Sequence, residues 1–133
     1  MLRTLDTNIC SYILRKRPES LVQRFSALDV GDVWISVIVA AELRFGAAKL
    51  GSDVFAAVIE GWIAGFEVRP WPVEASSYYA QVRQSLDSQG QPIGNMDLMI
   101  AAHALAEDSV VITNNAREFH RVPGLAVEEW RLS

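Results

Sequence analysis

Short, mostly apolar segments alternate with longer amphipathic ones along this chain, and this alternation limits its fold more than any other feature. The short segments have the length and composition of buried strands, and they lie at residues 2–5, 33–35, 66–69 and 110–112. Between them, apolar residues recur at three- and four-residue spacing, as on one face of a helix. Strands separated by helices predict right-handed crossovers and an α/β fold, with a mostly parallel central sheet and helices on both of its faces.

Cap and breaker residues indicate where the helices begin and end. Asp6 precedes the first apolar stripe, and Pro18 interrupts it. Ser36 is expected to cap a helix that ends near Gly51, and Asn95 to cap the last long helix. Further apolar stripes lie at residues 21–28, 54–62, 75–86 and 96–105.

Length and composition favour a single globular unit. The chain has 133 residues, of which 50% are apolar, so we expect one domain spanning residues 1–133. No run of about 18 apolar residues occurs, and charge appears as early as Arg3, which predicts a cytoplasmic protein without a membrane segment. Cys10 is the only cysteine and cannot form an internal disulfide, so we expect an inert, buried thiol.

The charge balance limits how the protein can use nucleic acid. A formal net charge of -4 argues against a protein that coats nucleic acid non-specifically. Ten of the 12 basic residues are nevertheless Arg, which contacts phosphate in a bidentate manner. Their densest group is Arg15, Lys16 and Arg17, which is either a local phosphate-binding patch or a solvated loop.

Acidic residues occupy positions where a parallel sheet places its ligands. Asp6 follows the first strand, Asp97 lies near the start of the last long helix, and Glu42 lies in the helix after the second strand. Carboxylates in one cleft repel one another, and a divalent cation offsets that repulsion; oxygen ligands favour Mg²⁺ or Mn²⁺. Such an ion polarises a phosphoryl group and activates water. The simpler interpretation remains open: Asp6 and Asp97 as helix caps, and Glu42 as a solvated surface acid.

Four motifs resemble the PIN-domain toxins, and more narrowly the VapC family. They are LDTN at residues 5–8, AEL at 41–43, IGNMD at 93–97 and TNNAREF at 113–119, and the similarity continues to VPGL at 122–125. The resemblance implies a PIN-like three-layer α/β/α sandwich and an Mg²⁺-dependent endoribonuclease, in which Mn²⁺ can substitute. It also implies that Asp6, Glu42 and Asp97 are the acidic site positions.

Other site residues follow from the same motifs. Many PIN domains carry a fourth acid where this chain has Asn115, which offers only a neutral oxygen, and Glu118 is a candidate for the missing charge. Thr113 and Asn8 are candidates to hold the acids in place, or are simply turn and cap residues. The candidate RNA-binding residues are Arg15, Arg17, Arg44, Arg117 and Arg121. His103 lies on an apolar helix face and is expected to pack rather than catalyse, whereas His120 is a weaker candidate for phosphate contact.

The function implied by the resemblance is that of the toxin in a type II toxin–antitoxin pair. The toxin would inhibit translation by cleaving structured RNA, with tRNA, including the anticodon region of initiator tRNA, as the expected substrate. Expected partners are a VapB-like antitoxin and a second copy of the chain, with DNA contacted only through the antitoxin. Aromatic residues that could line a partner groove or simply pack in the core are Trp62, Trp71, Tyr78 and Tyr79.

The sequence leaves two alternatives from other classes. The first is a catalytically silent PIN-like module that binds protein or RNA, which the neutral Asn115 favours. The second is a phosphotransferase of the haloacid-dehalogenase type, which also has an Asp after its first strand. Its second Asp would fall at Asn8, which speaks against it.

Overall fold

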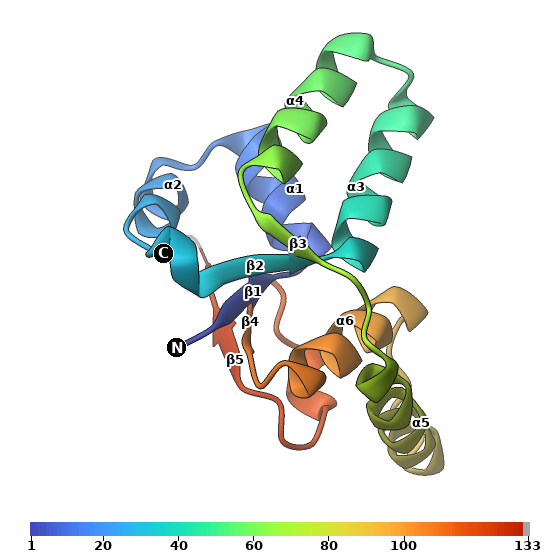
Figure 1. Ribbon diagram of the computed structural model, residues 1–133. Helices are drawn as coiled ribbons and strands as arrows, with labels where there is room; N and C mark the ends of the chain where they lie inside the picture. Colours follow the sequence, from blue (N-terminus) through green and yellow to red (C-terminus); the bar gives the residue numbers. More distant parts are fainter. Residues whose placement is uncertain (132–133) are drawn as a thin grey trace.

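The computed structural model describes residues 1–131, which form a five-stranded sheet in the order β3-β2-β1-β4-β5 (Figure 1). Every pair of neighbouring strands is parallel. The strands are β1 (Arg3–Leu5), β2 (Val33–Ser36), β3 (Glu67–Arg69), β4 (Val110–Thr113) and β5 (Val127–Glu129). The prediction of an α/β fold with a mostly parallel sheet is confirmed.

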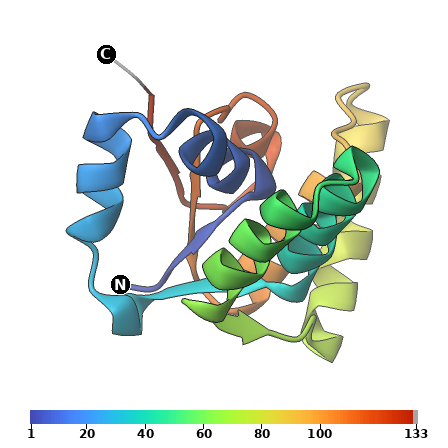
Figure 2. The ribbon, with the colours of Figure 1, turned by 90° about the horizontal axis from the view of Figure 1, so that it is seen from above.

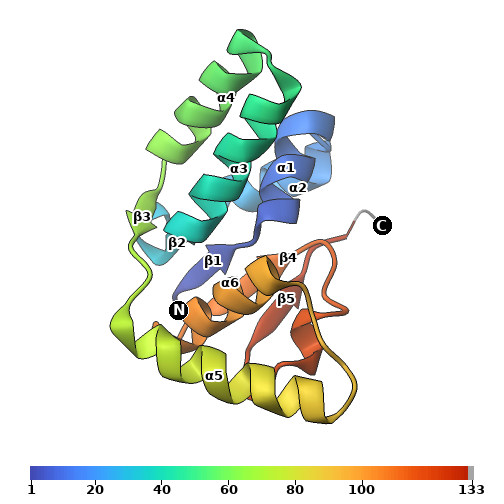
Figure 3. The same cartoon turned by 90° about the vertical axis from the view of Figure 1, so that its right-hand side faces the viewer.

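Six helices form the two outer layers of this region. They are α1 (Thr7–Lys16), α2 (Glu19–Ser26), α3 (Val37–Leu50), α4 (Asp53–Ala64), α5 (Val73–Ser88) and α6 (Asn95–Ala106). The chain moves from β1 through β2 to β3 in one direction and then returns to β4, so right-handed crossovers place α1 to α4 on one face and α5 and α6 on the other (Figures 1 and 3). Seen from above, α3 and α4 lie side by side as an antiparallel pair (Figure 2).

The core lies on both faces of the three central strands. Every residue of β2 and β4 is buried, as expected for strands covered by helices on both sides. On β2, the indole of Trp34 packs 4.5 Å from the His103 ring, and its Nε1 donates a hydrogen bond to Ser109 Oγ (3.0 Å). The polar atoms of this large buried side chain are therefore satisfied as well as packed.

Most of the predicted element ends agree with the structure. Ser36 caps α3 by accepting a hydrogen bond from the Ile38 N–H (3.1 Å), and that helix ends at Gly51 with a left-handed φ of 73°. Cys10 is fully buried, and burial raises the pKa of its thiol to about 12, which keeps the thiol protonated and inert. No helix within residues 1–131 is long and apolar enough to cross a membrane.

Two details differ from the predictions. Gly94, not Asn95, is the N-cap of α6, and no side chain caps that helix, so the capping role predicted for Asn95 is wrong. The edge strand β5 was not predicted, because Val127–Glu129 contains two Glu residues and lacks the apolar run of a central strand. It forms by pairing with β4, and the Trp130 N–H beyond it donates a hydrogen bond to the Thr113 carbonyl (2.8 Å). That pairing partner lies far away in the sequence.

Two of the candidate groove aromatics contribute to packing. The Trp62 ring lies 5.1 Å from both the Phe25 and the Phe66 rings, which joins α2, α4 and the segment before β3. Trp71 Nε1 donates a hydrogen bond to the Met99 carbonyl of α6 (3.0 Å). Tyr78, by contrast, is exposed on α5.

We expect α4 to show the energetic contrast between its buried and exposed faces. Ile59→Ala should lower the free energy of unfolding by about 2–5 kcal/mol, because it leaves a cavity where a side chain only 2% exposed now packs. Val54→Ala on the same helix, where the side chain is 77% exposed, should change it by no more than about 0.5 kcal/mol. Urea denaturation followed by circular dichroism measures both. Equal losses would show that α4 does not pack as described.

Candidate active site

Asp6 lies at the junction of β1 and α1, and its carboxylate is almost completely buried. Its Oδ1 accepts a hydrogen bond from the Ile9 N–H (2.8 Å), which caps α1, and its Oδ2 accepts one from the Thr113 hydroxyl (2.6 Å). Burial raises the pKa of Asp6 to about 6, opposed by these two hydrogen bonds and assisted by the charge of Glu42. The cap interpretation and the acidic-site interpretation therefore apply to one and the same carboxylate.

Thr113, the last residue of β4, connects that carboxylate to the following loop. Its side chain is fully buried, and while its hydroxyl donates to Asp6, its Oγ1 accepts a hydrogen bond from the Asn115 N–H (3.0 Å). The Asp6 N–H also donates to the Ile112 carbonyl (3.1 Å). The carboxyl ends of β1 and β4 are thus joined by backbone and side-chain bonds.

Glu42 reaches the same edge from α3. The Thr7 hydroxyl, in the first turn of α1, donates a hydrogen bond to Glu42 Oε1 (2.5 Å). Sequence reasoning missed Thr7, although its place next to Asp6 in the LDTN motif was the available signal. The bond orients the half-buried Glu42 side chain toward the start of α1, the helix that Asp6 caps.

Asp97 and Glu118 complete the group. The pKa of Asp97 is raised to about 7, chiefly by burial and in smaller part by a hydrogen bond with the Glu118 carboxyl and by the charges of Asp6, Glu118 and Glu42. Two carboxyls share a hydrogen bond only when one of them holds a proton. Because the charges of Asp6, Glu118 and Glu42 all raise the pKa of Asp97, Asp97 lies within electrostatic reach of these three acids. We call Asp6, Glu42, Asp97 and Glu118 the acid cluster.

The donor set of the acid cluster is chemically suited to Mg²⁺ or Mn²⁺. It consists of carboxylate oxygens, which hard divalent cations prefer, and the raised pKa values of Asp6 and Asp97 show that negative charge is costly there. Among the described residues, no three His, Cys, Asp or Glu side chains stand in a ready coordination arrangement. The cluster oxygens instead take part in the hydrogen bonds with Thr7, Thr113 and Ile9 and in the Asp97–Glu118 contact.

Asn8 and Asn115 lie beside the acid cluster rather than within it. Both residues are exposed, and both line a hollow next to α1. Within residues 1–131 the Asn8 side chain makes no hydrogen bond to Asp6; the neighbouring Thr7 bonds Glu42 instead. Asn115 is held through its backbone N–H, and its side-chain amide makes no hydrogen bond within residues 1–131.

The candidate RNA-binding arginines fall into two groups. Arg44 forms a two-point pair with Glu60 (2.9 Å for each contact), and Arg121 donates a hydrogen bond to the Pro92 carbonyl (3.1 Å). Arg15, Arg17 and Arg117 are exposed, and no carboxylate of the described residues lies within 4.0 Å of their guanidinium groups. Within the described residues, Arg44 is thus the one candidate whose charge is compensated by a close ion pair; Arg121 and the second group have none.

The two histidines differ in environment. His103 is fully buried on α6, with Nδ1 2.8 Å from Ser36 Oγ and Nε2 3.4 Å from a Glu107 oxygen. Burial lowers the pKa of His103, so its ring is neutral at physiological pH and serves packing. His120 is exposed in the 3-10 turn Phe119–Arg121.

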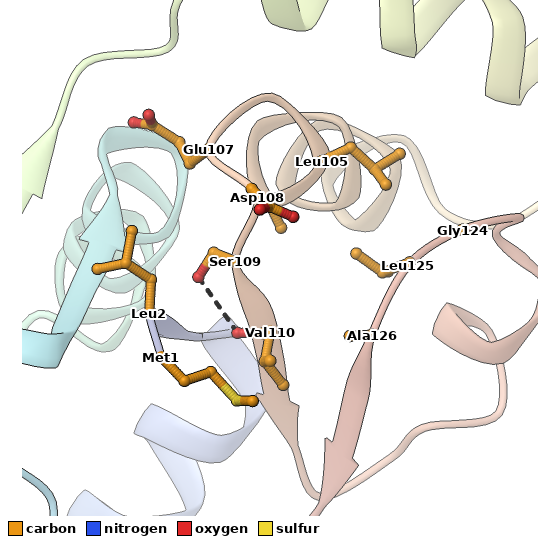
Figure 4. Close-up of a pocket in the computed structure, with 11 residues that line it drawn as sticks. Met1, Leu2, Leu105, Glu107, Asp108, Ser109, Val110, Gly124, Leu125 and Ala126 are labelled. Carbon is orange, nitrogen blue, oxygen red and sulfur yellow. Dashed lines mark hydrogen bonds between the residues drawn. The ribbon is translucent and has the colours of Figure 1, made fainter.

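A large hollow on the described surface lies at the opposite edge of the sheet. It encloses about 580 Å³ near the starts of β1 and β4, between Leu2, Leu105, Glu107 and Leu125 (Figure 4). Ser109 donates a weak hydrogen bond to the Val110 carbonyl on its wall (3.4 Å). Members of the acid cluster do not line this hollow. We place the candidate site at the edge that carries the acid cluster, because the acids and not the volume of a hollow provide the chemistry.

Comparison with known proteins identifies the family of the chain. Residues 3–125 match the PIN domain family. The chain is 41% identical over 127 residues to the tRNA(fMet)-specific endonuclease VapC of Salmonella typhimurium, which covers 95% of this chain and 96% of the relative. It is 36% identical over 132 residues to the ribonuclease VapC2 of Rickettsia felis, with 98% of each covered.

Solved structures show the same relationship in three dimensions. The structure superposes on DNA-bound VapBC from Salmonella typhimurium with a TM-score of 0.91 at 41% identity, covering 98% of this chain and 99% of the other. The family match spans nearly the whole fold, including the PIN-like three layers predicted from the motifs. The chain therefore belongs to the VapC family of PIN-domain ribonuclease toxins.

Proposed function

We propose that this chain is the toxin of a VapBC-type pair and an Mg²⁺-dependent endoribonuclease that cleaves structured RNA, with tRNA as its substrate class and initiator tRNA as the first substrate to test. The observation that carries the proposal is the acid cluster at the carboxyl edge of β1 and β4. A relative at 41% identity is a tRNA(fMet)-specific endonuclease, which supports the choice of substrate. We further propose that residues 1–133 form one PIN domain that acts in the cytoplasm.

In this proposal Asp6, Glu42 and Asp97 hold the cation, and Glu118 adds charge beside Asp97. When bound, the cation supplies Lewis-acid stabilisation of a phosphoryl oxygen and lowers the pKa of a water molecule. Thr113 and the Ile9 N–H fix the orientation of Asp6, and Thr7 fixes that of Glu42. Glu42 either contributes a ligand or accepts the proton of the attacking water, and the exposed Arg15, Arg17 and Arg117 contact RNA phosphates.

The proposed partners follow from the solved relatives. VapBC complexes from Salmonella typhimurium and Rickettsia felis were solved with DNA bound. We propose that this chain likewise pairs with a VapB-like antitoxin, forms a homodimer within that assembly, and meets DNA only through the antitoxin. A silent RNA- or protein-binding module is the second candidate, because Asn115 places a neutral amide where many PIN domains carry an acid.

Loss of a single acid should abolish cleavage. Asp97→Asn removes a charge from the cluster with little change of shape, so metal-dependent cleavage of total tRNA should fall by about 100-fold or more. The antitoxin-free chain would be incubated with tRNA in Mg²⁺, in Mn²⁺ and in EDTA. Asp29→Asn, at an exposed position away from the cluster, is the matched control and should keep full activity. Intact tRNA together with measurable Mn²⁺ binding by the unaltered chain would favour the silent module.

The acid cluster should make stability depend on pH. The pKa of Asp97 rises from 3.8 to about 7 on folding and that of Asp6 to about 6, so the folded state binds more protons and loses this stabilisation as pH increases through that window. In EDTA, the melting temperature of the unaltered chain should therefore fall, relative to Asp97→Asn, between about pH 4 and about pH 8. Mn²⁺ should reverse the fall in the unaltered chain. Parallel pH profiles for the two proteins would contradict the described cluster.

Thr113 should influence metal binding through Asp6. Thr113→Val removes the hydroxyl that donates to Asp6, and the Mn²⁺ affinity should drop by about 10–100-fold in a calorimetric titration. Thr4→Val is the matched control, since its equally buried hydroxyl donates to the Trp34 carbonyl (2.8 Å) in β2. Both variants should lose similar stability, but only Thr113→Val should lose Mn²⁺ affinity. If both bind Mn²⁺ equally well, Thr113 is merely structural.

A further inference from the structure

A hollow of about 340 Å³ opens on the carboxyl edge of the sheet, beside the acid cluster. One wall is the exposed side of α1, with Asn8, Ser11 and Tyr12 near its start and Arg15 and Lys16 at its end. The opposite wall is the loop after β4, which contributes Asn114 and Asn115. We call this the α1 hollow.

The α1 hollow is directly connected to the acid cluster. Asn8 lies two residues after Asp6, and Asn114 immediately follows Thr113. The Thr113 hydroxyl donates a hydrogen bond to Asp6 (2.6 Å), and the Asn115 N–H donates one to Thr113 Oγ1 (3.0 Å). These two bonds join the start of α1 to the loop after β4, and so connect the two walls of the hollow. A molecule in the hollow would therefore lie next to Asp6.

The lining changes in character along α1. Near Asp6 it offers amides and hydroxyls, which donate and accept hydrogen bonds without adding charge. Asn114 Oδ1 is buried and has no hydrogen-bond partner among residues 1–131, so the Asn114 amide is not committed to the protein's own bonding. Toward the end of α1, Arg15 and Lys16 lie farther than 4.0 Å from every described carboxylate.

This gradient matches the chemistry of one unpaired ribonucleotide. A nucleotide combines a base edge and a 2′-hydroxyl, both of which form neutral hydrogen bonds, with an anionic phosphate. The half-buried Tyr12 adds an aromatic ring of the kind on which unpaired bases stack. A volume near the lower limit of small-ligand sites, about 300 Å³, suits a single nucleotide and is too small for a duplex.

We propose that the α1 hollow holds one unpaired nucleotide of the RNA substrate, next to the phosphodiester that the acid cluster cleaves. Its base edge lies on the Asn8, Asn114 and Asn115 amides, and its phosphate on Arg15 and Lys16. This inference rests on the proposed function for the identity of the substrate as RNA. It adds that the enzyme selects unpaired RNA through a subsite built by α1 and the loop after β4.

The two lysines of the chain provide the first test. Lys16→Gln should weaken binding of a short, fluorescently labelled single-stranded RNA by about three- to tenfold and should lower the salt dependence of binding by about one phosphate contact. Lys49→Gln, at an exposed position on α3 outside the hollow, should bind as the unaltered chain does. Fluorescence anisotropy in EDTA measures binding without cleavage. Equal affinities for the two variants would overturn the proposal.

Filling the hollow provides the second test. Ser11→Trp should raise KM for RNA cleavage by about tenfold while leaving Mn²⁺ affinity and melting temperature unchanged, because Ser11 lies in the hollow but not in the acid cluster. Ser88→Trp, exposed on α5, is the control. An RNA carrying 4-thiouridine should cross-link under ultraviolet light to the α1 segment that contains Tyr12, and less so in Ser11→Trp.

The outcomes separate this inference from the proposed function. Cleavage by Ser11→Trp with an unchanged KM would disprove the subsite while the nuclease activity stands. If the chain cleaved no RNA but its RNA binding depended on Lys16, the subsite would be supported and the proposed nuclease activity would be contradicted. If Lys16→Gln weakened the binding of an acidic peptide but not the binding of RNA, the proposal would also be overturned, since that result would identify a protein ligand.

Discussion

The buried carboxylate of Asp6 is the constraint on which the rest of this site depends. It caps α1, connects the end of β1 to the end of β4 through Thr113, and lies within electrostatic reach of the other acids. A carboxylate in such a place normally has its pKa lowered by its hydrogen bonds, yet that of Asp6 is raised to about 6 because burial outweighs them. The fold therefore keeps an acid whose charge is only partly compensated by the protein itself. A bound cation is the usual compensation for such a group.

A second buried contact determines where the other acids lie. Ser36 Oγ caps α3, the helix that carries Glu42, and His103 of α6 approaches the same oxygen to 2.8 Å. Because Asp97 and His103 both lie on α6, this contact links the two helices that bring Glu42 and Asp97 to Asp6. The Trp34 ring covers His103 and excludes water from the contact. His103 thus packs, as the sequence indicated, and also contacts the side chain that caps the helix carrying Glu42.

Sequence patterns predicted those parts of the molecule that depend on local physics. Buried strands, the Ser36 cap and the end of α3 at Gly51 follow from residues close together in the chain. The family motifs correctly predicted the fold, and the structure places Asp6, Glu42 and Asp97 within mutual electrostatic reach. Sequence reasoning did not find β5, the Thr7–Glu42 bond or the Arg44–Glu60 pair. Each of these joins segments distant in the sequence, and such pairings leave no periodic signal.

The neutral Asn115 is best understood together with Glu118. Residue 115 is exposed, lies two residues after Thr113 and lines the α1 hollow, so an acid there would face the hollow. Glu118 instead brings its carboxyl to Asp97 from the turn anchored by the buried Phe119. The acid cluster thus contains four carboxyls, and none of the four residues lines the α1 hollow. The wall of the hollow stays uncharged as a result, and an uncharged wall repels an RNA phosphate less than a carboxylate there would.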